Sequence, residues 1–322
     1  MTPTDEAKRL ETATVEVKAV SRWYGNVVAV NDISFTLGPG ITALLGPNGA
    51  GKSTVLHMIA GFLRASKGTV RVLGQPAFGN PDIYEKVGLV PEREAVYSFL
   101  SGYEFVLTMA RLHGLKDPAA AARRAIQTVD MEAFQKRKMG GYSKGMKQRI
   151  KMAAGMVHEP SVLLLDEPFN GTDPTQRLQM MELLRAMAAR GKTIVVSSHI
   201  LEEVERLAGN IVVIVAGRLA ASGDFRSIRR LMTDRPYSFT VRSSDNRGLA
   251  VALLGDASVF GVELNGDRLT VRTSLFSDFV RAAPRVARSA DITLRELIPA
   301  DESLESVFSY LVAPSASLRT GR

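Results

Sequence analysis

The run GPNGAGKST stands between two apolar stretches and has the composition of an anion-binding loop. It covers residues 46–54, after the apolar stretch 41–45 and before a second one at 55–59. Its three glycines allow backbone N–H groups to turn toward phosphate oxygens, and a helix beginning near Lys52 directs the positive end of its dipole to the same anion. Lys52 adds a full positive charge, and the Ser53 hydroxyl is suited to ligate Mg²⁺. These two side chains favour a phosphate-binding loop over a simple glycine turn.

Two adjacent carboxylates follow an apolar stretch farther along the chain. Residues 162–165 are all aliphatic, and Asp166 and Glu167 come directly after them. Open α/β sheets bind ligands at the carboxyl ends of their strands, so both side chains would face a bound phosphate. We expect Asp166 to hold Mg²⁺ through a water molecule and Glu167 to polarise the attacking water. The alternative is an ordinary acidic turn after a buried strand, and the phosphate-binding loop upstream argues against it.

His199 also follows an expected strand, at residues 193–197. A single histidine in such a place is more often a capping or core residue, and we assign His57, His113 and His158 to that class. The strand before His199 is expected beside the strand before Glu167, which would let its imidazole reach the terminal phosphate.

The segment YSKGMKQR, residues 142–149, places Ser143 and Gly145 at the start of an expected helix. A helix N-terminus with a serine cap can bind an anion through its free backbone N–H groups. Many helices begin in this way, so the segment by itself does not define a site.

The elements that must position these residues alternate between strand and helix. Two strands precede the phosphate loop as an antiparallel lead-in, and helical spacing of apolar residues over 98–160 indicates a helical insertion. The order predicts an α/β domain over residues 15–232 with a mainly parallel sheet covered by helices. Its expected strands lie at 15–20, 32–37, 41–45, 68–73, 87–90, 162–165, 193–197 and 211–215, and its later helices at 177–190 and 201–207.

Residues 233–312 predict a second, smaller α+β domain. Their order of elements, β-α-β-β-α-β, is that of the ferredoxin-like split motif, closed by one further helix. Residues 1–14 and 313–322 are expected to be flexible tails. The elements of the second domain are expected at 237–242, 248–254, 259–264, 269–273, 277–288, 292–297 and 304–311.

Composition narrows the class of protein. The chain has 322 residues, a net charge of +8 and no cysteine, which suggests two domains and excludes disulfides and thiolate metal sites. No apolar run reaches the roughly 18 residues that span a bilayer, and the first residues lack the apolar core of a signal peptide, so we expect a cytoplasmic protein. Basic residues are dispersed and do not alternate with aromatic residues that could stack on bases, so no nucleic-acid partner is expected.

Taken together, these motifs resemble the ATP-binding subunits of ATP-binding cassette (ABC) transporters over about residues 15–223. Residues 46–54 match the Walker A loop of that family, 162–167 its Walker B strand and 142–149 its signature segment. Residues 170–173 fall at the D-loop, and His199 falls at the switch histidine. The resemblance implies the P-loop ABC ATPase fold and the cofactors ATP and Mg²⁺.

The resemblance also assigns roles to single residues. It implies that Glu167 and His199 are catalytic, and that Ser143, Gly145 and Asp173 contact ATP held by a second, opposing domain. Tyr24, beside Trp23, falls at the aromatic residue that stacks on adenine, for which a core aromatic is the alternative. The residues implied to contact ATP within one chain are Tyr24, Gly46, Pro47, Asn48, Gly49, Ala50, Gly51, Lys52, Ser53 and Thr54.

The implied Mg²⁺ ligands are Ser53, Asp166 and Glu92. Glu92 stands where the family usually has the Q-loop glutamine, and its carboxylate adds negative charge near the γ-phosphate. The signature segment departs from the common sequence at Lys144 and Met146, whereas the serine and the second glycine are retained.

The implied function is ATP hydrolysis at a head-to-tail dimer of two ATP-binding domains, which drives a separate transmembrane permease. The segments 295–299 and 303–308 look like the endings of exporters of drugs, antibiotics and polysaccharides, so export is expected. The opposing domain is expected to be a second copy of the chain or a related subunit. The permease is expected to hold the pair at the inner face of the cell membrane. An importer ATPase with a regulatory C-terminal domain is the alternative, followed by a soluble cassette that acts on nucleic acid or ribosomes.

Overall fold

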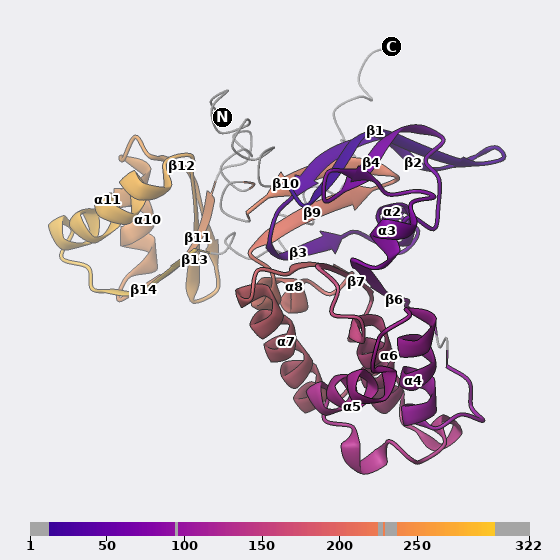
Figure 1. Cartoon of the computed structure of the whole chain (residues 1–322). Helices are drawn as coiled ribbons and strands as arrows, with labels where there is room; N and C mark the ends of the chain where they lie inside the picture. Colours follow the sequence, from indigo (N-terminus) through magenta and orange to yellow (C-terminus); the bar gives the residue numbers. More distant parts are fainter. Residues whose placement is uncertain (1–12, 94–95, 225–227, 229–236, 300–322) are drawn as a thin grey trace. The chain divides into compact units, whose positions relative to one another are not determined.

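The computed structural model describes residues 13–93, 96–224, 228 and 237–299 (Figure 1). Contacts divide the chain into two units, the first ending at Asp224 and the second beginning at Phe225. Sequence analysis places this boundary after residue 232, in a stretch that is largely outside the described residues. The expected helix at 304–311 and the C-terminal tail also lie outside them.

Unit 1 begins with a four-stranded antiparallel sheet in the order β2-β1-β4-β5. Thr14, assigned above to the N-terminal tail, already belongs to this sheet region, because its N–H donates to Leu37 O and its carbonyl accepts from Leu73 N, both at 2.7 Å. The strands are β1 (Val15–Tyr24), β2 (Val27–Leu37), β4 (Lys67–Val72) and β5 (Gln75–Pro76).

A six-stranded sheet in the order β10-β9-β3-β8-β7-β6 forms the centre of unit 1. Strands β9, β3, β8, β7 and β6 run parallel, and β10 pairs antiparallel with β9. Sequence analysis missed β10, whose sequence RLAASG contains few residues typical of strands. The strands are β3 (Gly40–Leu45), β6 (Val87–Val90), β7 (Val162–Asp166), β8 (Thr193–Ser198), β9 (Asn210–Val215) and β10 (Arg218–Gly223).

Both faces of this sheet are buried, which explains its uninterrupted apolar strands. Leu163 and Leu165 pack into a core with the helices that follow β6, whereas Val162 and Leu164 pack into a second core with β1, β2 and the first helix. Because side chains alternate between faces along a strand, one short apolar run contributes to two cores.

Helices cover the central sheet, and α4, α5 and α6 gather on the side away from β1, β2 and β4 (Figure 1). Side chains cap several of them: Ser101 and Glu104 form a capping box at α4, and Asp117 caps α5. The helices are α2 (Lys52–Ile59), α3 (Pro81–Tyr84), α4 (Gly102–Leu112), α5 (Pro118–Thr128), α6 (Lys144–Met156), α7 (Pro174–Ala189) and α8 (Leu201–Leu207).

Unit 2 follows the expected β-α-β-β-α-β order and has its own core. Its antiparallel sheet has the order β12-β13-β11-β14, and Phe239, Val241, Leu269 and Val271 of the two middle strands are fully buried with residues of both helices. The elements are β11 (Tyr237–Ser243), α10 (Asn246–Leu254), β12 (Val259–Asn265), β13 (Arg268–Thr273), α11 (Phe276–Ser289) and β14 (Leu294–Pro299).

Within the residues that the structure describes, none of the helices combines the length and the apolar character that crossing a bilayer requires.

Candidate functional site

A cavity of about 310 Å³ lies where the loops after β3, β6 and β7 meet. It therefore opens at the carboxyl ends of parallel strands, the position at which open α/β sheets bind ligands. Most of the expected ATP-contacting loop and all three expected Mg²⁺ ligands line it. The lining residues are Ala29, Asn48, Gly49, Ala50, Gly51, Lys52, Ser53, Thr54, Glu92, Asp166 and Glu167.

The loop between β3 and α2 needs glycine for two physical reasons. Gly49 and Gly51 have φ of 78° and 104°, in the left-handed region that other residues rarely adopt. Gly51 also caps α2, and a Cβ there would lie 2.6 Å from Ala29 O. A Cβ at Gly46 would collide with Ile214 O of β9. The glycines therefore let the loop turn tightly beside two other segments and present its backbone to the cavity.

Lys52 is the buried cation of the site. Its side chain is only 6% exposed, and its ammonium group donates to Gly46 O at 2.8 Å and to Pro47 O at 3.3 Å. The same nitrogen lies 3.4 Å from Glu167 Oε1. Lys52 is thus held against its own loop and beside the acidic end of β7, where it can also meet a phosphate.

Glu167 is fixed through both its backbone and its side chain. It has a positive φ of 47°, and its N–H donates to Ser197 Oγ at 2.8 Å. Ser197 Oγ in turn donates to Asp166 Oδ1 at 2.6 Å, so one hydroxyl on β8 holds both carboxylate residues. Glu167 Oε2 lies 2.9 Å from His199 Nδ1, the geometry of an imidazole N–H donating to a carboxylate.

Glu167 Oε1 has a distinctive environment. It is buried and forms no hydrogen bond, although the Lys52 ammonium lies within ion-pair distance. A buried carboxylate oxygen without a hydrogen bond, beside a cavity, is a suitable acceptor for a water proton. This geometry fits the role of a base that orients or deprotonates water.

A second layer of side chains supports the loop that carries His199. Ser198 Oγ accepts from Ile200 N at 3.0 Å and donates to Glu203 Oε2 at 2.9 Å, which shapes the loop around His199. Arg177 of α7 pairs with Glu203 Oε1 at 3.1 Å. Burial raises the pKa of Glu203, while the hydrogen bond from Ser198 and the charge of Arg177 oppose this shift.

Sequence analysis missed the residues of this supporting layer, above all Ser197 and Glu203. The adjacent serines before His199 carry a weak signal, since buried hydroxyls at a strand end can bond to a neighbouring loop. The burial of Glu203 was not predictable from the sequence, because it lies in a short helix, LEEVERL, whose many charged residues indicate an exposed surface.

The expected contacts to an opposing nucleotide lie outside the cavity. Ser143 and Asp173 cap α6 and α7, accepting from Met146 N at 3.2 Å and from Gln176 N at 2.9 Å. A Cβ at Gly145 would collide with the end of the Gln176 side chain, which would have to move to make room for it. These residues form a neighbouring group on two helix N-termini.

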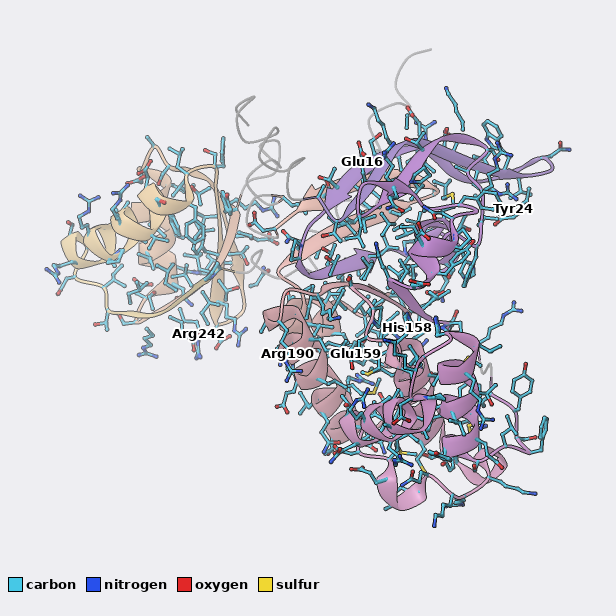
Figure 2. All side chains as sticks on the ribbon, in the orientation of Figure 1. Glu16, Tyr24, His158, Glu159, Arg190 and Arg242 are labelled. Atoms are coloured by element: carbon cyan, nitrogen blue, oxygen red, sulfur yellow. The ribbon has the colours of Figure 1, made fainter. Side chains whose placement is uncertain are left out.

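Tyr24 also lies outside the cavity. Figure 2 shows it in the antiparallel sheet, at the end of β1. Tyr24 is 46% exposed, and the Arg22 guanidinium carbon lies 4.7 Å from the centre of its ring. This exposure contradicts the alternative of a core aromatic, and the expected stacking of Tyr24 on adenine stays a prediction.

The chemistry of the lining residues fits Mg²⁺. A hydroxyl from Ser53 and carboxylates from Asp166 and Glu92 share the cavity, and hard cations prefer such oxygen ligands. Among the described residues, no cluster of three or more histidine, cysteine or acidic side chains is arranged to hold a metal alone. Mg²⁺ is usually bound by one or two carboxylates together with phosphate oxygens.

Two of the histidines assigned to the core class form a stacked pair. The rings of His113 and His158 are parallel within 11°, with their centres 3.8 Å apart, and His158 Nε2 lies 3.2 Å from Val87 O. Burial, aided by the charge of His113, lowers the pKa of His158 to about 4. Figure 2 places His158 near α4 and α6.

Comparison with known proteins supports the assignment. Residues 30–170 match the family model described as ABC transporter. An uncharacterized ABC transporter ATP-binding protein of Nostoc sp. is 40% identical over 61% of this chain, which spans 60% of that relative's length. A Nod factor export ATP-binding protein of Burkholderia orbicola is 37% identical over 66% of the chain and 72% of the relative. A bacitracin transport ATP-binding protein of Enterococcus faecalis is 31% identical, and the match covers 92% of this chain and 96% of that relative.

A solved structure of an ATP-binding subunit of an ABC transporter has the same fold. It superposes with a TM-score of 0.63 at 30% sequence identity, and the match covers 68% of this chain and 93% of that one.

Proposed function

The chain belongs to the ATP-binding proteins of ABC transporters, and from this premise we propose that it is the ATP-hydrolysing subunit of an exporter with a separate membrane permease. The observation that carries the catalytic part is that Glu167, which lines the cavity, contacts both Lys52 and His199. The export direction is supported by the relatives named for Nod factor export and bacitracin transport.

The site performs hydrolysis mainly by positioning and electrostatics. The backbone N–H groups of residues 46–54 and the Lys52 ammonium bind the phosphates. Mg²⁺ held by Ser53, Asp166 and Glu92 would supply further neutralisation of their negative charge. Glu167 orients a water and accepts its proton, and His199 keeps the Glu167 carboxylate in place through the bond from Nδ1.

In this proposal two ATP-binding domains close head to tail. Ser143, Gly145 and Asp173 lie on the N-termini of α6 and α7, where free N–H groups can meet the phosphates of an opposing nucleotide. The opposing domain is a second copy of the chain or a related subunit. The permease brings the pair to the inner face of the membrane, and the helical insertion supplies the surface that contacts it.

A tagged chain tests both parts of the proposal. Detergent-solubilised membranes of the source cell should yield the chain together with a polytopic membrane protein, and the complex should hydrolyse ATP. Lys52→Ala should weaken ATP binding by roughly 10- to 100-fold, because it removes a charge-assisted contact to phosphate. Lys116→Ala, at an exposed lysine of the same unit, should leave binding unchanged. Recovery with ribosomes or nucleic acid in place of a membrane protein would overturn the exporter assignment.

A further inference from the structure

Lys151 is a buried lysine that the proposed mechanism does not use. It lies on α6 and is 4% exposed. Its ammonium nitrogen is 2.7 Å from Pro91 O, 3.1 Å from Glu92 O and 3.1 Å from Arg93 O. A lysine ammonium has three N–H donors, and three consecutive backbone carbonyls surround this one.

Burial of an ammonium group is costly unless hydrogen bonds compensate for the water it loses. The contacts of Lys151 provide this compensation, and they are of the charge-assisted kind, stronger than bonds between neutral groups. They also constrain the carbonyls. Three successive peptide groups that converge on one nitrogen fix the course of the loop after β6.

That loop carries Glu92, which lines the cavity beside Asp166 and Glu167. Glu92 also lines an adjoining hollow of about 190 Å³, together with Lys144, Lys147 and other residues near the start of α6. Glu92 therefore lies between the proposed nucleotide site and α6, and the position of its backbone decides whether its side chain can reach the cavity.

The same face of α6 fixes the neighbouring loop. Gln148, three residues before Lys151 and hence on the same side of the helix, donates to Pro168 O at 3.0 Å and lies 3.4 Å from Glu167 O. The two loops follow the adjacent parallel strands β6 and β7. One helix face thus holds the backbone of both acidic loops.

We propose that Lys151 is a positioning residue that tethers the Pro91–Arg93 backbone to α6 and so holds Glu92 at the nucleotide cavity. The consequence for Glu92 rests on the proposed function, whereas the tether is a property of the free chain. Because α6 begins at Ser143 and Gly145, the tether also joins Glu92 to the segment expected to meet the opposing nucleotide.

The tether is tested without nucleotide. Hydrogen–deuterium exchange of the peptide containing Glu92 and Arg93 should be about tenfold faster, or more, in full-length Lys151→Met than in the wild type, as loss of a charge-assisted bond predicts. Lys151→Arg keeps charge and donors and should restore most of the protection, and Lys116→Met should change nothing. Unaltered exchange in a folded Lys151→Met variant would overturn the tether. If that variant does not fold, Lys151→Gln, which keeps two donors, takes its place.

The consequence for Glu92 is tested by a double-variant cycle. Lys151→Met should raise the Mg²⁺ concentration needed for half-maximal ATP hydrolysis and lower kcat, with less effect on the KM for ATP. In a Glu92→Ala background the same change should have little further effect, because residues that act through one another are not additive. Additive effects with faster exchange would leave the tether intact but refute the positioning of Glu92. An inactive wild type would instead refute the proposed function, while the exchange experiment would still decide the tether.

Discussion

At the scale of single residues, the site depends on how Glu167 is held. Its backbone N–H is bonded to Ser197, its Oε2 to His199, and its Oε1 remains beside Lys52 without a hydrogen bond. The sequence placed the main participants correctly beside one another, because their types and their places at strand ends are visible in the chain. It did not identify Ser197, because the expected pairing of β8 with β7 leaves the register open, and only the register that pairs Ser197 with Asp166 brings this hydroxyl to the carboxylates.

His158 gives a residue-scale prediction about pH. Burial lowers its pKa from 6.5 to about 4, so below about pH 6.5 the unfolded chain gains a proton that the folded chain does not take up. The free energy of unfolding should therefore fall as pH decreases from about 6.5 to about 4. We expect His158 to account for about 1–2 kcal/mol of this loss, allowing for its partial exposure.

Urea unfolding at several pH values measures this contribution. His158→Gln retains a donor for Val87 O and should show a weaker fall in stability toward low pH than the wild type. His57→Gln, at a histidine outside the stacked pair, is the control. An identical pH dependence in His158→Gln and the wild type would contradict this assignment.

At the scale of elements, the phosphate-binding loop depends on close approach as much as on backbone conformation. Gly51→Ala would force a methyl group toward Ala29 O, 2.6 Å away, in a residue with a φ of 104°. We expect a loss of stability above the ~1–3 kcal/mol of backbone strain alone, together with loss of ATP binding. Thermal unfolding and nucleotide titration measure the two effects.

Gly114→Ala separates strain from crowding. Gly114 has a φ of 64°, but no atom lies within 4 Å of the position that its Cβ would take. The free energy of unfolding of this variant should fall by only about 1–2 kcal/mol, and its ATP affinity should be unchanged. Equal behaviour of the two variants would show that the contact with Ala29 does not matter.

Elements were predictable where their periodicity is strong and uninterrupted. The sequence predicted β3 before the Walker A loop, β7 before Glu167 and the β-α-β-β-α-β order of unit 2. The strand expected at 32–37 begins earlier, at Val27, because β2 continues through Asp32. Asp32 has a φ of 52° and lies where the pairing of β2 with β1 changes register. Such bulges are set by pairing with the neighbouring strand, which a local pattern does not contain.

At the scale of the whole molecule, the chain has separate cores in its two units. Calorimetry should resolve two unfolding transitions. Mg-ATP should raise the transition temperature of unit 1 and leave that of unit 2 unchanged. At a nucleotide concentration 100 times Kd the expected stabilisation is about 2.7 kcal/mol. At the same nucleotide concentration, Lys52→Ala should reduce this stabilisation to about 0.4–1.4 kcal/mol, since its Kd is expected to be 10- to 100-fold higher. A single transition, or an equal shift of both, would contradict independent units with one nucleotide site.

The family and fold class were predictable from the sequence and are confirmed by the relatives and by the solved structure. The chain is therefore an ABC-type ATP hydrolase. The roles of single site residues stay predictions, and the positions of Tyr24, Ser143 and Asp173 outside the cavity show why. Their expected partners are a nucleotide base and an opposing domain, and a single chain contains neither.

The most direct measurement of the central claim is ATP turnover by Glu167→Gln. The change keeps the size and one acceptor oxygen at this position but removes the base, so Mg-ATP binding should persist while kcat falls by at least about 10²-fold. The ATP-bound variant should also accumulate as a dimer, since hydrolysis no longer opens it. Glu182→Gln, at an exposed glutamate of α7, should retain normal turnover. Near-normal hydrolysis by Glu167→Gln would contradict the assignment of Glu167 as the base.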